Sequence, residues 1–399
     1  MQIPPFSLDE QISEIGDEIE KALIKVFRSG KYIGGEEVAS FEKAFALAIE
    51  TSYSVSCNSG TDALILALRS LNIGEGDEVI TSSFSFFATA EAITSVGARP
   101  VFVDIDPENY LMDLDLIEKV ITPRTKAILP VHLFGQPIDM DKIMAIAEVN
   151  NLKVVEDCAQ AAGAHWRGKP VGSYGDVGCF SFFPTKNLGA AGDGGAITTN
   201  NLELAKTIRE LAVHGMPKRY FHTNIGYNSR LDSLQAAILN VKLTRLNKWI
   251  EQRKAIAINY ISQLSSIESI ELPSNNLSNN SFHSWNQFVI RIMDNSFVKN
   301  IKATSEDVFD NTNRDLFKNE LHRLGVNTII YYPIPIHLQP AYRELGYTEG
   351  SLPITEKVCS QVISLPIFPE LKFIQQSYVI DRIKAVSYTH LTLPTKRIV

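Results

Sequence analysis

Over its first 250 residues the chain alternates between short β-rich runs and helical patterns. The runs are rich in Val, Ile and Phe, which is typical of buried strands. They occupy residues 78–82, 99–105, 126–132, 152–157 and 176–182, and helical patterns follow Gly60 and cover 86–96 and 139–150. Strands that alternate with helices predict an α/β fold with a mostly parallel sheet flanked by helices. In such a sheet, ligands bind at the carboxyl ends of the strands.

The second part of the chain has a different organisation. A helical pattern begins near Leu231 and continues to about residue 264, and we interpret it as one long connector between domains. Strand, helix and strand patterns follow at 285–292, 314–326 and 327–332. The sequence therefore predicts a large domain over residues 1–245 and a smaller C-terminal α+β domain over 246–385. Residues 386–399 do not fit this pattern, and we interpret them as a non-native tail.

Composition argues against several classes of protein. The formal net charge is −7 and no run of Lys and Arg is present, so we expect no nucleic-acid partner. No apolar stretch approaches the ~18 residues that a membrane span needs, and the acidic N-terminus is unlike a signal peptide. The four cysteines form no CxxC pair and the eight histidines no HExxH motif, so we expect no metal site. These features favour a cytoplasmic enzyme.

Two segments contain residues suited to chemistry at a carbonyl group. Lys186 follows a strand and Pro184, in a turn rich in glycine. Burial among apolar residues would lower its pKa and free its amine to form a Schiff base, although a loop lysine is more often a solvent-facing residue. Asp157 ends the apolar run 152–157, where a carboxylate is costly without a cationic partner. A protonated pyridine nitrogen is one such partner, and a turn-capping acid is the alternative.

Two further segments are weaker indications of a binding site. Residues 56–63 place small residues at the start of an apolar helix, where backbone N–H groups can bind a phosphate. The alternative is a plain helix cap formed by Ser59, Thr61 or Asp62. In the segment 83–91, Phe86 could stack on a planar ring or simply pack in the core.

Together these segments resemble the DegT/DnrJ/EryC1/StrS family of sugar aminotransferases, which are fold-type I enzymes that depend on pyridoxal 5'-phosphate (PLP). The resemblance extends from about Pro5 to Lys384. It rests on four motifs that follow one another in family order: SGTDAL at 59–64, EDCAQ at 156–160, SFFPTKNLGAAGDGGA at 181–196 and GYNSRLDSLQAA at 226–237.

The resemblance implies a role for each matching residue. Lys186 would be the Schiff-base lysine and proton shuttle, and Asp157 would pair with the pyridinium nitrogen. The remaining cofactor residues would be Gln160 beside the ring, Phe86 stacked on it, Gly60, Thr61 and Ser181 at the phosphate, and Asn228 reaching the phosphate of the neighbouring subunit. The last role implies a homodimer with shared active sites.

The resemblance also implies a substrate class. An amino acid, L-glutamate, would give its amino group to a nucleotide-linked keto-sugar, because segments 228–232 and 331–339 resemble the branch that aminates 3-keto-hexoses. The product would enter a polysaccharide, a lipopolysaccharide or a glycosylated metabolite. The candidate substrate-binding residues are Tyr32, Arg230, Tyr331, Tyr332 and His337. Arg230 could instead form an interface ion pair, and the residues at 331, 332 and 337 could instead pack in the core.

Three other functions stay open at this point. A 4-keto-sugar aminotransferase would use the same cofactor residues. A PLP sugar dehydratase of this family would carry His in place of the Schiff-base lysine, whereas position 186 is Lys. A regulatory or binding homologue would keep the fold without the chemistry.

Overall fold

A seven-stranded sheet forms the centre of the molecule, in the order β1-β9-β8-β5-β4-β2-β3. The computed structural model describes residues 1–274, 280–293 and 312–389. The strands of the sheet are β1 (Tyr53–Cys57), β2 (Glu78–Ser82), β3 (Arg99–Val103), β4 (Thr125–Leu129), β5 (Lys153–Asp157), β8 (Val177–Ser181) and β9 (Gly195–Thr199). β9 pairs antiparallel with both of its neighbours, and the other pairs in this sheet are parallel. The predicted mostly parallel sheet is therefore confirmed, and its strands include all five predicted runs.

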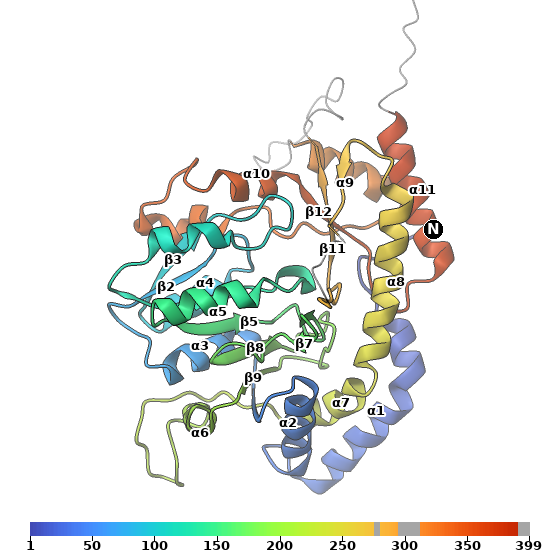
Figure 1. Cartoon of the computed structure of the whole chain (residues 1–399). Helices are drawn as coiled ribbons and strands as arrows, with labels where there is room; N and C mark the ends of the chain where they lie inside the picture. The colour runs from blue at the N-terminus through green and yellow to red at the C-terminus, as the bar shows by residue number, and fades with distance from the viewer. Residues whose placement is uncertain (275–279, 294–311, 390–399) are drawn as a thin grey trace, which may run out of the picture.

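Helices cover the sheet, as the alternating pattern predicted (Figure 1). The helices of this part of the chain are α2 (Glu36–Ala48), α3 (Gly60–Ser70), α4 (Ala88–Ser95), α5 (Met140–Val149) and α6 (Leu202–Leu211). α3 contacts both α4 and α6 and packs on β5, β8 and β9, whereas α5 packs on β4 and β5. Side-chain caps begin three of these helices: Ser59 at α3, Asp139 at α5 and Asn201 at α6. A hairpin of β6 (His165–Trp166) and β7 (Lys169–Pro170) lies between β5 and β8 in the sequence.

The long connector predicted from Leu231 is two helices rather than one. α7 (Ser233–Leu243) begins at the side-chain cap Asp232, and α8 (Leu246–Leu264) begins after a break at residues 244–245. The prediction of a continuous helix was wrong because the two halves pack on different neighbours. α7 contacts α2 and α1 (Asp9–Ser29), whereas α8 contacts α11 (Phe373–Thr389).

A second hydrophobic core lies beside the first, around a three-stranded antiparallel sheet. Its strands are β10 (Ile270–Glu271), β11 (Phe288–Ile292) and β12 (Val362–Leu365), and the helices of this region are α9 (Asn313–Arg323), α10 (Pro353–Gln361) and α11. Ile3, at the start of the chain, also packs in this core and bridges to Val326. Figure 1 accordingly shows the N-terminus next to α11.

Two sequence predictions in this region meet different outcomes. The strand predicted at 327–332 is wrong: Ile329 makes only an isolated bridge to Ser364, and β12 supplies the third strand. Two prolines, Pro333 and Pro335, follow directly and limit regular pairing. Of the predicted tail, residues 386–389 continue α11, and residues 390–399 lie outside the described residues.

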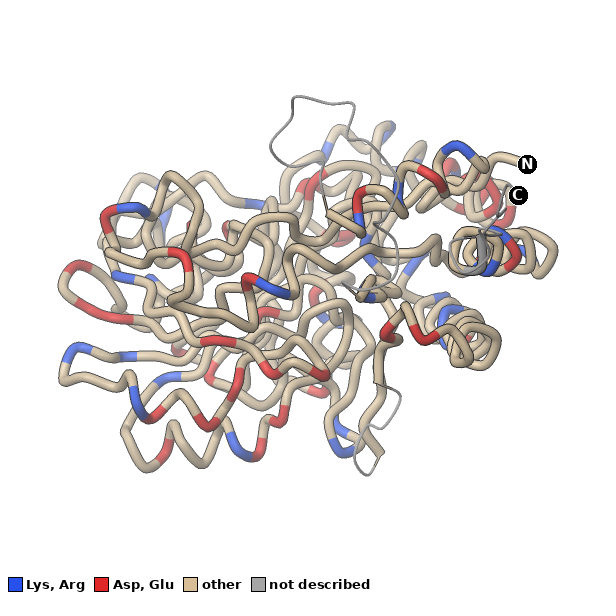
Figure 2. Tube along the Cα trace, turned by 90° about the horizontal axis from the view of Figure 1, so that it is seen from above, with Lys and Arg blue, Asp and Glu red and all other residues tan. Residues whose placement is uncertain are grey.

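Charged residues of both signs are interleaved along the described chain (Figure 2). Among the helices of the described ranges, none is both long enough and apolar enough to cross a membrane.

Candidate active site

A cavity of about 540 Å³ opens at the carboxyl edge of the parallel strands. It is bordered by the residues that follow β1, β2, β4, β5 and β8, and by a wall from the second core. Its lining includes Ser59, Gly60, Thr61, Ser85, Phe86, Thr89, Asp157, Gln160, Ser181, Lys186, Gln287, Ile330, Tyr331 and Tyr332. Nine of the thirteen predicted site residues are therefore brought together here, since only Tyr32, Asn228, Arg230 and His337 do not line the cavity.

Lys186 faces this cavity from the turn after β8. Its backbone N–H donates to the Phe183 carbonyl (2.9 Å), which closes the turn around Pro184. Burial lowers the pKa of the Lys186 amine to about 8, and the negative charge of Asp157 opposes only part of that shift. A larger fraction of the amine is therefore neutral near pH 8 than for an exposed lysine, and a neutral amine can act as a nucleophile or a base.

Two side chains of α7 hold the turn that carries Lys186. The buried Lys242 on α7 donates from Nζ to the Gly189 carbonyl (2.8 Å), and the Ala191 N–H donates to Gln235 Oε1 (2.9 Å). A Cβ atom at Gly189 would lie 2.4 Å from the Pro184 carbonyl oxygen, so the turn requires glycine at this position. Residues from α7 thus position the turn, which explains why the motif at 226–237 belongs to the same site.

Asp157 ends β5 and reaches the cavity with only 4% of its surface exposed. Its Oδ1 accepts a hydrogen bond from the Ala159 N–H (3.1 Å), and its Oδ2 accepts one from the Thr89 hydroxyl (2.9 Å). Burial raises the pKa of the Asp157 carboxyl, and these two donors and the charges of Lys186 and His132 oppose the rise. The geometry leaves a buried carboxylate that a cation bound in the cavity would stabilise.

The start of α3 also borders the cavity. Ser59 caps the helix by accepting from the Asp62 N–H (3.1 Å), so the cap predicted as an alternative is present. Gly60 and Thr61 are the first helical residues, where backbone N–H groups lack intrahelical partners. A Cβ atom at Gly60 would lie 2.6 Å from the Ser181 Cβ, so glycine allows the end of β8 to approach this terminus. Backbone donors and the Ser181 hydroxyl can together bind an anion.

Aromatic and amide side chains form another part of the cavity wall. Gln160 accepts from the Phe134 N–H at Oε1 (2.7 Å) and donates from Nε2 to the Tyr332 hydroxyl (2.9 Å), which fixes the orientation of its amide. Phe86 is 59% exposed, and its ring centroid lies 6.1 Å from that of Tyr332. An aromatic face is therefore available to a planar ligand.

His337 is buried outside this lining. Its Nδ1 lies 2.7 Å from the Ser83 hydroxyl, and its Nε2 lies 3.1 Å from Glu356 Oε1. Its backbone N–H also donates to the Ser83 hydroxyl (3.1 Å). Both ring nitrogens are occupied, so His337 joins the loop after β2 to Glu356 of α10. Its predicted contact with substrate stays a prediction.

Tyr32, Asn228 and Arg230 lie together on the surface next to the start of α7. All three are exposed, and Arg230 donates to the Asn228 side chain. The Tyr32 carbonyl accepts from the Ser233 N–H (2.8 Å), and its hydroxyl donates to the Phe27 carbonyl (3.0 Å). Between Asn228 and Arg230, the buried Ser229 donates to Asn58 (3.0 Å), beside the start of α3. None of the three lines the cavity, so their predicted roles toward cofactor and substrate stay predictions.

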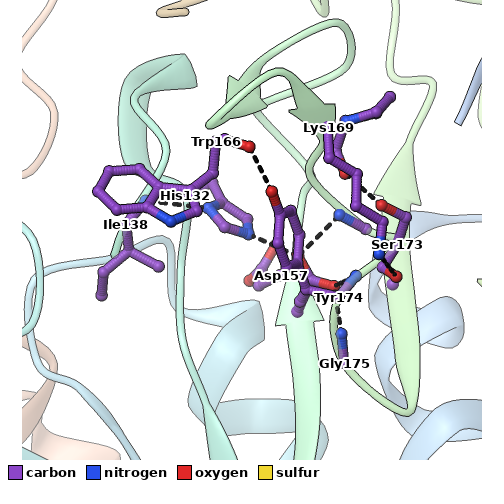
Figure 3. A network of polar contacts seen from close by, with 12 residues as sticks. His132, Ile138, Asp157, Trp166, Lys169, Ser173, Tyr174 and Gly175 are labelled. Atoms are coloured by element: carbon purple, nitrogen blue, oxygen red, sulfur yellow. Dashed lines mark hydrogen bonds and ion pairs between the residues drawn. The ribbon is translucent and has the colours of Figure 1, made fainter. Parts of the chain in front are cut away.

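The side chain of Glu156 belongs to a different network, which includes His132, Tyr174 and Gly175. Figure 3 shows these three partners close together. One carboxylate oxygen accepts from the N–H groups of Tyr174 and Gly175, and the other from that of Gly172 and from His132 Nε2 (2.7–3.1 Å). His132 Nδ1 accepts from the Ile138 N–H (3.2 Å), which leaves the proton on Nε2. The Cys158 thiol lies close enough to share an ion with Glu156 and His132, but burial raises its pKa and the network is satisfied without an ion.

Sequence reasoning missed three polar residues of the cavity. Thr89 donates to Asp157, and Ser85 contacts Thr89. Gln287, which directly precedes β11, lines the cavity as well. Ser85 and Thr89 are four residues apart at a helix start, so their proximity could be predicted from the sequence. The contact of Thr89 with Asp157, which lies 68 residues further along the chain, could not.

The chemistry of these donors fits PLP. An anion site at α3, a carboxylate suited to a protonated ring nitrogen, an aromatic face and an amine of lowered pKa border one cavity. The lysine and the aspartate are the pair that PLP sites use, and the helix start and the aromatic face suit its phosphate and its ring.

The family resemblance is confirmed by comparison with known proteins. The profile of the DegT/DnrJ/EryC1/StrS aminotransferase family matches residues 13–384. A protein of Geobacillus stearothermophilus named pleiotropic regulatory protein is 43% identical over 390 residues, which are 98% of this chain and 100% of that protein. The UDP-2-acetamido-2-deoxy-3-oxo-D-glucuronate aminotransferase of Pseudomonas aeruginosa is 43% identical over 366 residues, which are 92% of this chain and 95% of that enzyme.

The fold is also that of a solved aminotransferase structure. The crystal structure of Streptomyces venezuelae DesV in complex with a ketimine intermediate superposes with a TM-score of 0.89. It is 40% identical in sequence, and the match covers 97% of this chain and 98% of that chain. The predicted fold-type I architecture is therefore confirmed.

Proposed function

Because this chain belongs to the DegT/DnrJ/EryC1/StrS aminotransferase family, we propose that it transfers the amino group of L-glutamate to the C3 keto group of a nucleotide-linked hexose. The observation that carries the proposal is that Lys186 and Asp157 face one cavity at the carboxyl edge of the sheet. The enzyme is an aminotransferase, and its cofactor is PLP.

Different residues of this chain would bind different parts of the cofactor. When bound, PLP supplies a carbonyl that combines with amines and a ring that withdraws electrons. Asp157 would keep the ring nitrogen protonated, and Phe86 and Gln160 would hold the ring. Gly60, Thr61 and Ser181 would bind the phosphate with backbone and hydroxyl donors. These assignments come from the family motifs, and the placement of the residues at one cavity supports them.

Lys186 is the group that moves the proton. With a pKa of about 8, its amine can accept a proton from the Cα atom of the donor and return it at the neighbouring carbon. A positioned acid–base group contributes a rate factor of about 10²–10⁴. The hydrogen bonds that anchor the turn at Gly189 and Ala191 hold the amine at the cavity through both half-reactions.

The proposed C3 position is supported by relatives rather than by a bound ligand. The name of the Pseudomonas aeruginosa relative specifies a sugar that is linked to UDP, carries a 3-oxo group and is itself a uronic acid. Arg230 would pair with a substrate carboxylate of that kind, because its planar guanidinium suits bidentate contacts. Tyr331 and Tyr332 would line the sugar site, with Tyr32 closing it and His337 behind it. Amination at C4 is the alternative that the same residues allow.

We also propose a cytoplasmic homodimer with shared active sites. Asn228, Arg230 and Tyr32 are exposed in one copy, beside the buried Ser229 that adjoins the cavity. Large apolar side chains near them are exposed as well: Phe27 (68%), Ile33 (60%), Tyr220 (80%) and Ile225 (86%). A second copy would cover these side chains and bring Asn228 to its phosphate. The product would enter polysaccharide or lipopolysaccharide synthesis, and residues 1–245 and 246–385 would form the two domains.

Absorbance spectroscopy tests the proposal most directly. Protein reconstituted with PLP should show a visible cofactor band that L-glutamate converts, with release of 2-oxoglutarate. Nucleotide-linked 3-keto- and 4-keto-hexoses, added separately, should then restore the band, and the 3-keto sugar should do so faster. Lys186→Ala is the control, in which glutamate should release no 2-oxoglutarate, because the group that moves the proton is absent. A faster response to the 4-keto sugar would select the C4 alternative.

Two other functions predict different results in this experiment. A sugar dehydratase would consume its sugar without glutamate. A regulatory protein, the function named for the Geobacillus stearothermophilus relative, would show no glutamate response. Lys186 and Asp157 at the cavity favour the aminotransferase.

A further inference from the structure

The carboxylate of Asp157 receives one of its two hydrogen bonds from a side chain that lies outside the four family motifs. Thr89, on the first turn of α4, donates its hydroxyl hydrogen to Asp157 Oδ2 (2.9 Å). Ser85 lies 2.7 Å from the same Thr89 oxygen. We propose that Thr89 is a positioning residue for Asp157, and that Ser85 orients the Thr89 hydroxyl. This inference rests on the proposed pairing of Asp157 with the ring nitrogen of PLP.

The chemistry of the two hydroxyl groups fixes the direction of the relay. Thr89 has a single hydroxyl hydrogen, and the ionised carboxylate can only accept it. The Ser85 hydroxyl is therefore the donor in the contact between Ser85 and Thr89. The result is a directed chain in which Ser85 donates to Thr89 and Thr89 donates to Asp157. Hydrogen bonds of this kind polarise one another and strengthen along the chain.

Burial makes this relay important for the charge on Asp157. Ser85, Thr89 and Asp157 are 5%, 1% and 4% exposed, so water reaches none of them freely. A buried carboxylate becomes protonated unless donors or cations stabilise its charge. A neutral Asp157 would no longer hold a proton on the ring nitrogen. Thr89 therefore supports the ionised state of Asp157 and fixes which oxygen faces the ring.

The loop that carries the relay is itself held in place. Ser83 contacts the segment 336–337 through its carbonyl, which accepts from the Ile336 N–H (3.0 Å), and through its hydroxyl, which contacts His337. Phe86 follows Ser85 in the same loop, so the aromatic face and the relay share one support. The loop after β2 thus carries both Phe86, which would stack on the ring of PLP, and the relay to Asp157, which would pair with the ring nitrogen.

Thr89→Val tests the role, because valine keeps the shape and removes the hydroxyl. We expect PLP to bind about tenfold to a hundredfold more weakly to this variant, with the loss growing at lower pH as Asp157 protonates. The value of kcat should fall while KM for the keto-sugar changes little. Thr89→Ser should restore PLP affinity to within a few-fold of wild type, and Ser85→Ala should show an intermediate loss. Thr207→Val, which removes a hydroxyl that donates to the Glu203 carbonyl within α6, is the matched control.

A double-mutant cycle distinguishes this role from a general loss of structure. If Thr89 acts through Asp157, Thr89→Val should not weaken PLP binding further in an Asp157→Asn background. An equal loss in both backgrounds would overturn the role, as would wild-type affinity and pH dependence in Thr89→Val. Wild-type protein that binds no PLP would contradict the proposed function as well, which separates that failure from failure of the relay.

Discussion

Two neighbouring carboxylates on β5 have opposite surroundings. Strand geometry turns Glu156 and Asp157 to opposite faces of the sheet. Glu156 is fully buried and accepts four hydrogen bonds, from three backbone N–H groups and His132 (Figure 3). Asp157 is buried at the cavity, and the two hydrogen bonds to its carboxylate come from Ala159 and Thr89. The fold itself therefore stabilises the Glu156 carboxylate, whereas a bound cation would stabilise the Asp157 carboxylate further.

This difference separates stability from function within one dipeptide. The carboxylate of Glu156, which accepts four hydrogen bonds, holds the segment 172–175 against β5. A buried carboxylate with fewer donors, such as Asp157, lowers the stability of the cofactor-free protein and favours the binding of a cationic ligand. Residues on the cavity side should therefore affect activity more than stability, and residues behind the strand should do the reverse.

The largest effect should come from the lysine that shares the cavity with Asp157. We expect Lys186→Ala to reduce the rate of transamination at least as much as the loss of a positioned proton-transfer group does. Such a group contributes a rate factor of about 10²–10⁴. Its unfolding midpoint in urea should not fall, because burial destabilises the charged amine. Lys126→Ala, at an exposed site on β4, is the control. A large loss of stability in Lys186→Ala would contradict the separation of activity from stability at the cavity.

Glu156→Gln should chiefly affect stability. The amide NH₂ of the variant would face two hydrogen-bond donors, so we expect the free energy of unfolding to fall by about 1–3 kcal/mol for each buried donor left without an acceptor. Urea denaturation of the cofactor-free protein measures this change. Glu148→Gln, at an exposed position on α5, should cost almost nothing. A mild effect on stability with a strong effect on PLP binding would reverse the assignment of the two carboxylates.

Asp157→Asn should stabilise the cofactor-free protein while weakening PLP binding. Burial raises the folded-state pKa of Asp157 above its unfolded value, so its favourable contribution is complete below the unfolded pKa and is lost as pH rises through the folded pKa. At neutral pH the ionised group therefore costs stability, by about 1.4 kcal/mol for every pH unit that separates the folded-state pKa from the unfolded-state pKa. The variant's advantage over wild type should be larger at pH 7 than at pH 4. A pH-independent difference between the two proteins would refute this reasoning.

The smallest effect concerns the titration of Lys186 itself. Its amine in the cofactor-free protein should react with a carbonyl reagent at a rate that rises with pH, with a midpoint near the pKa of about 8. Because the Asp157 charge raises this pKa, Asp157→Asn should move the midpoint lower. Glu156→Gln should leave it in place, since Glu156 faces the other side of the strand. Mass spectrometry of the reduced adduct across a pH series measures the midpoints.

Local sequence predicted the elements and many of the residues at the cavity, but not all contacts between them. Alternation of β-rich and helical runs identified β2, β5 and β8 within a residue or two, because buried strands need continuous apolar segments. The break between α7 and α8 and the irregular segment at 327–332 were missed. Both depend on packing against distant elements, which a local pattern does not record.

The sequence by itself determined the fold class through the alternation of strands and helices, and it indicated the chemical nature of the site through four motifs that resemble those of one PLP-dependent family. Tertiary structure alone decided the partners of these groups. It assigned His337 to Ser83 and Glu356, left Tyr32, Asn228 and Arg230 on the surface, and placed Thr89 against Asp157. The physical reason is that residue types set which interactions are possible. Burial and the meeting of segments far apart in the chain decide which of them form and which pKa values shift.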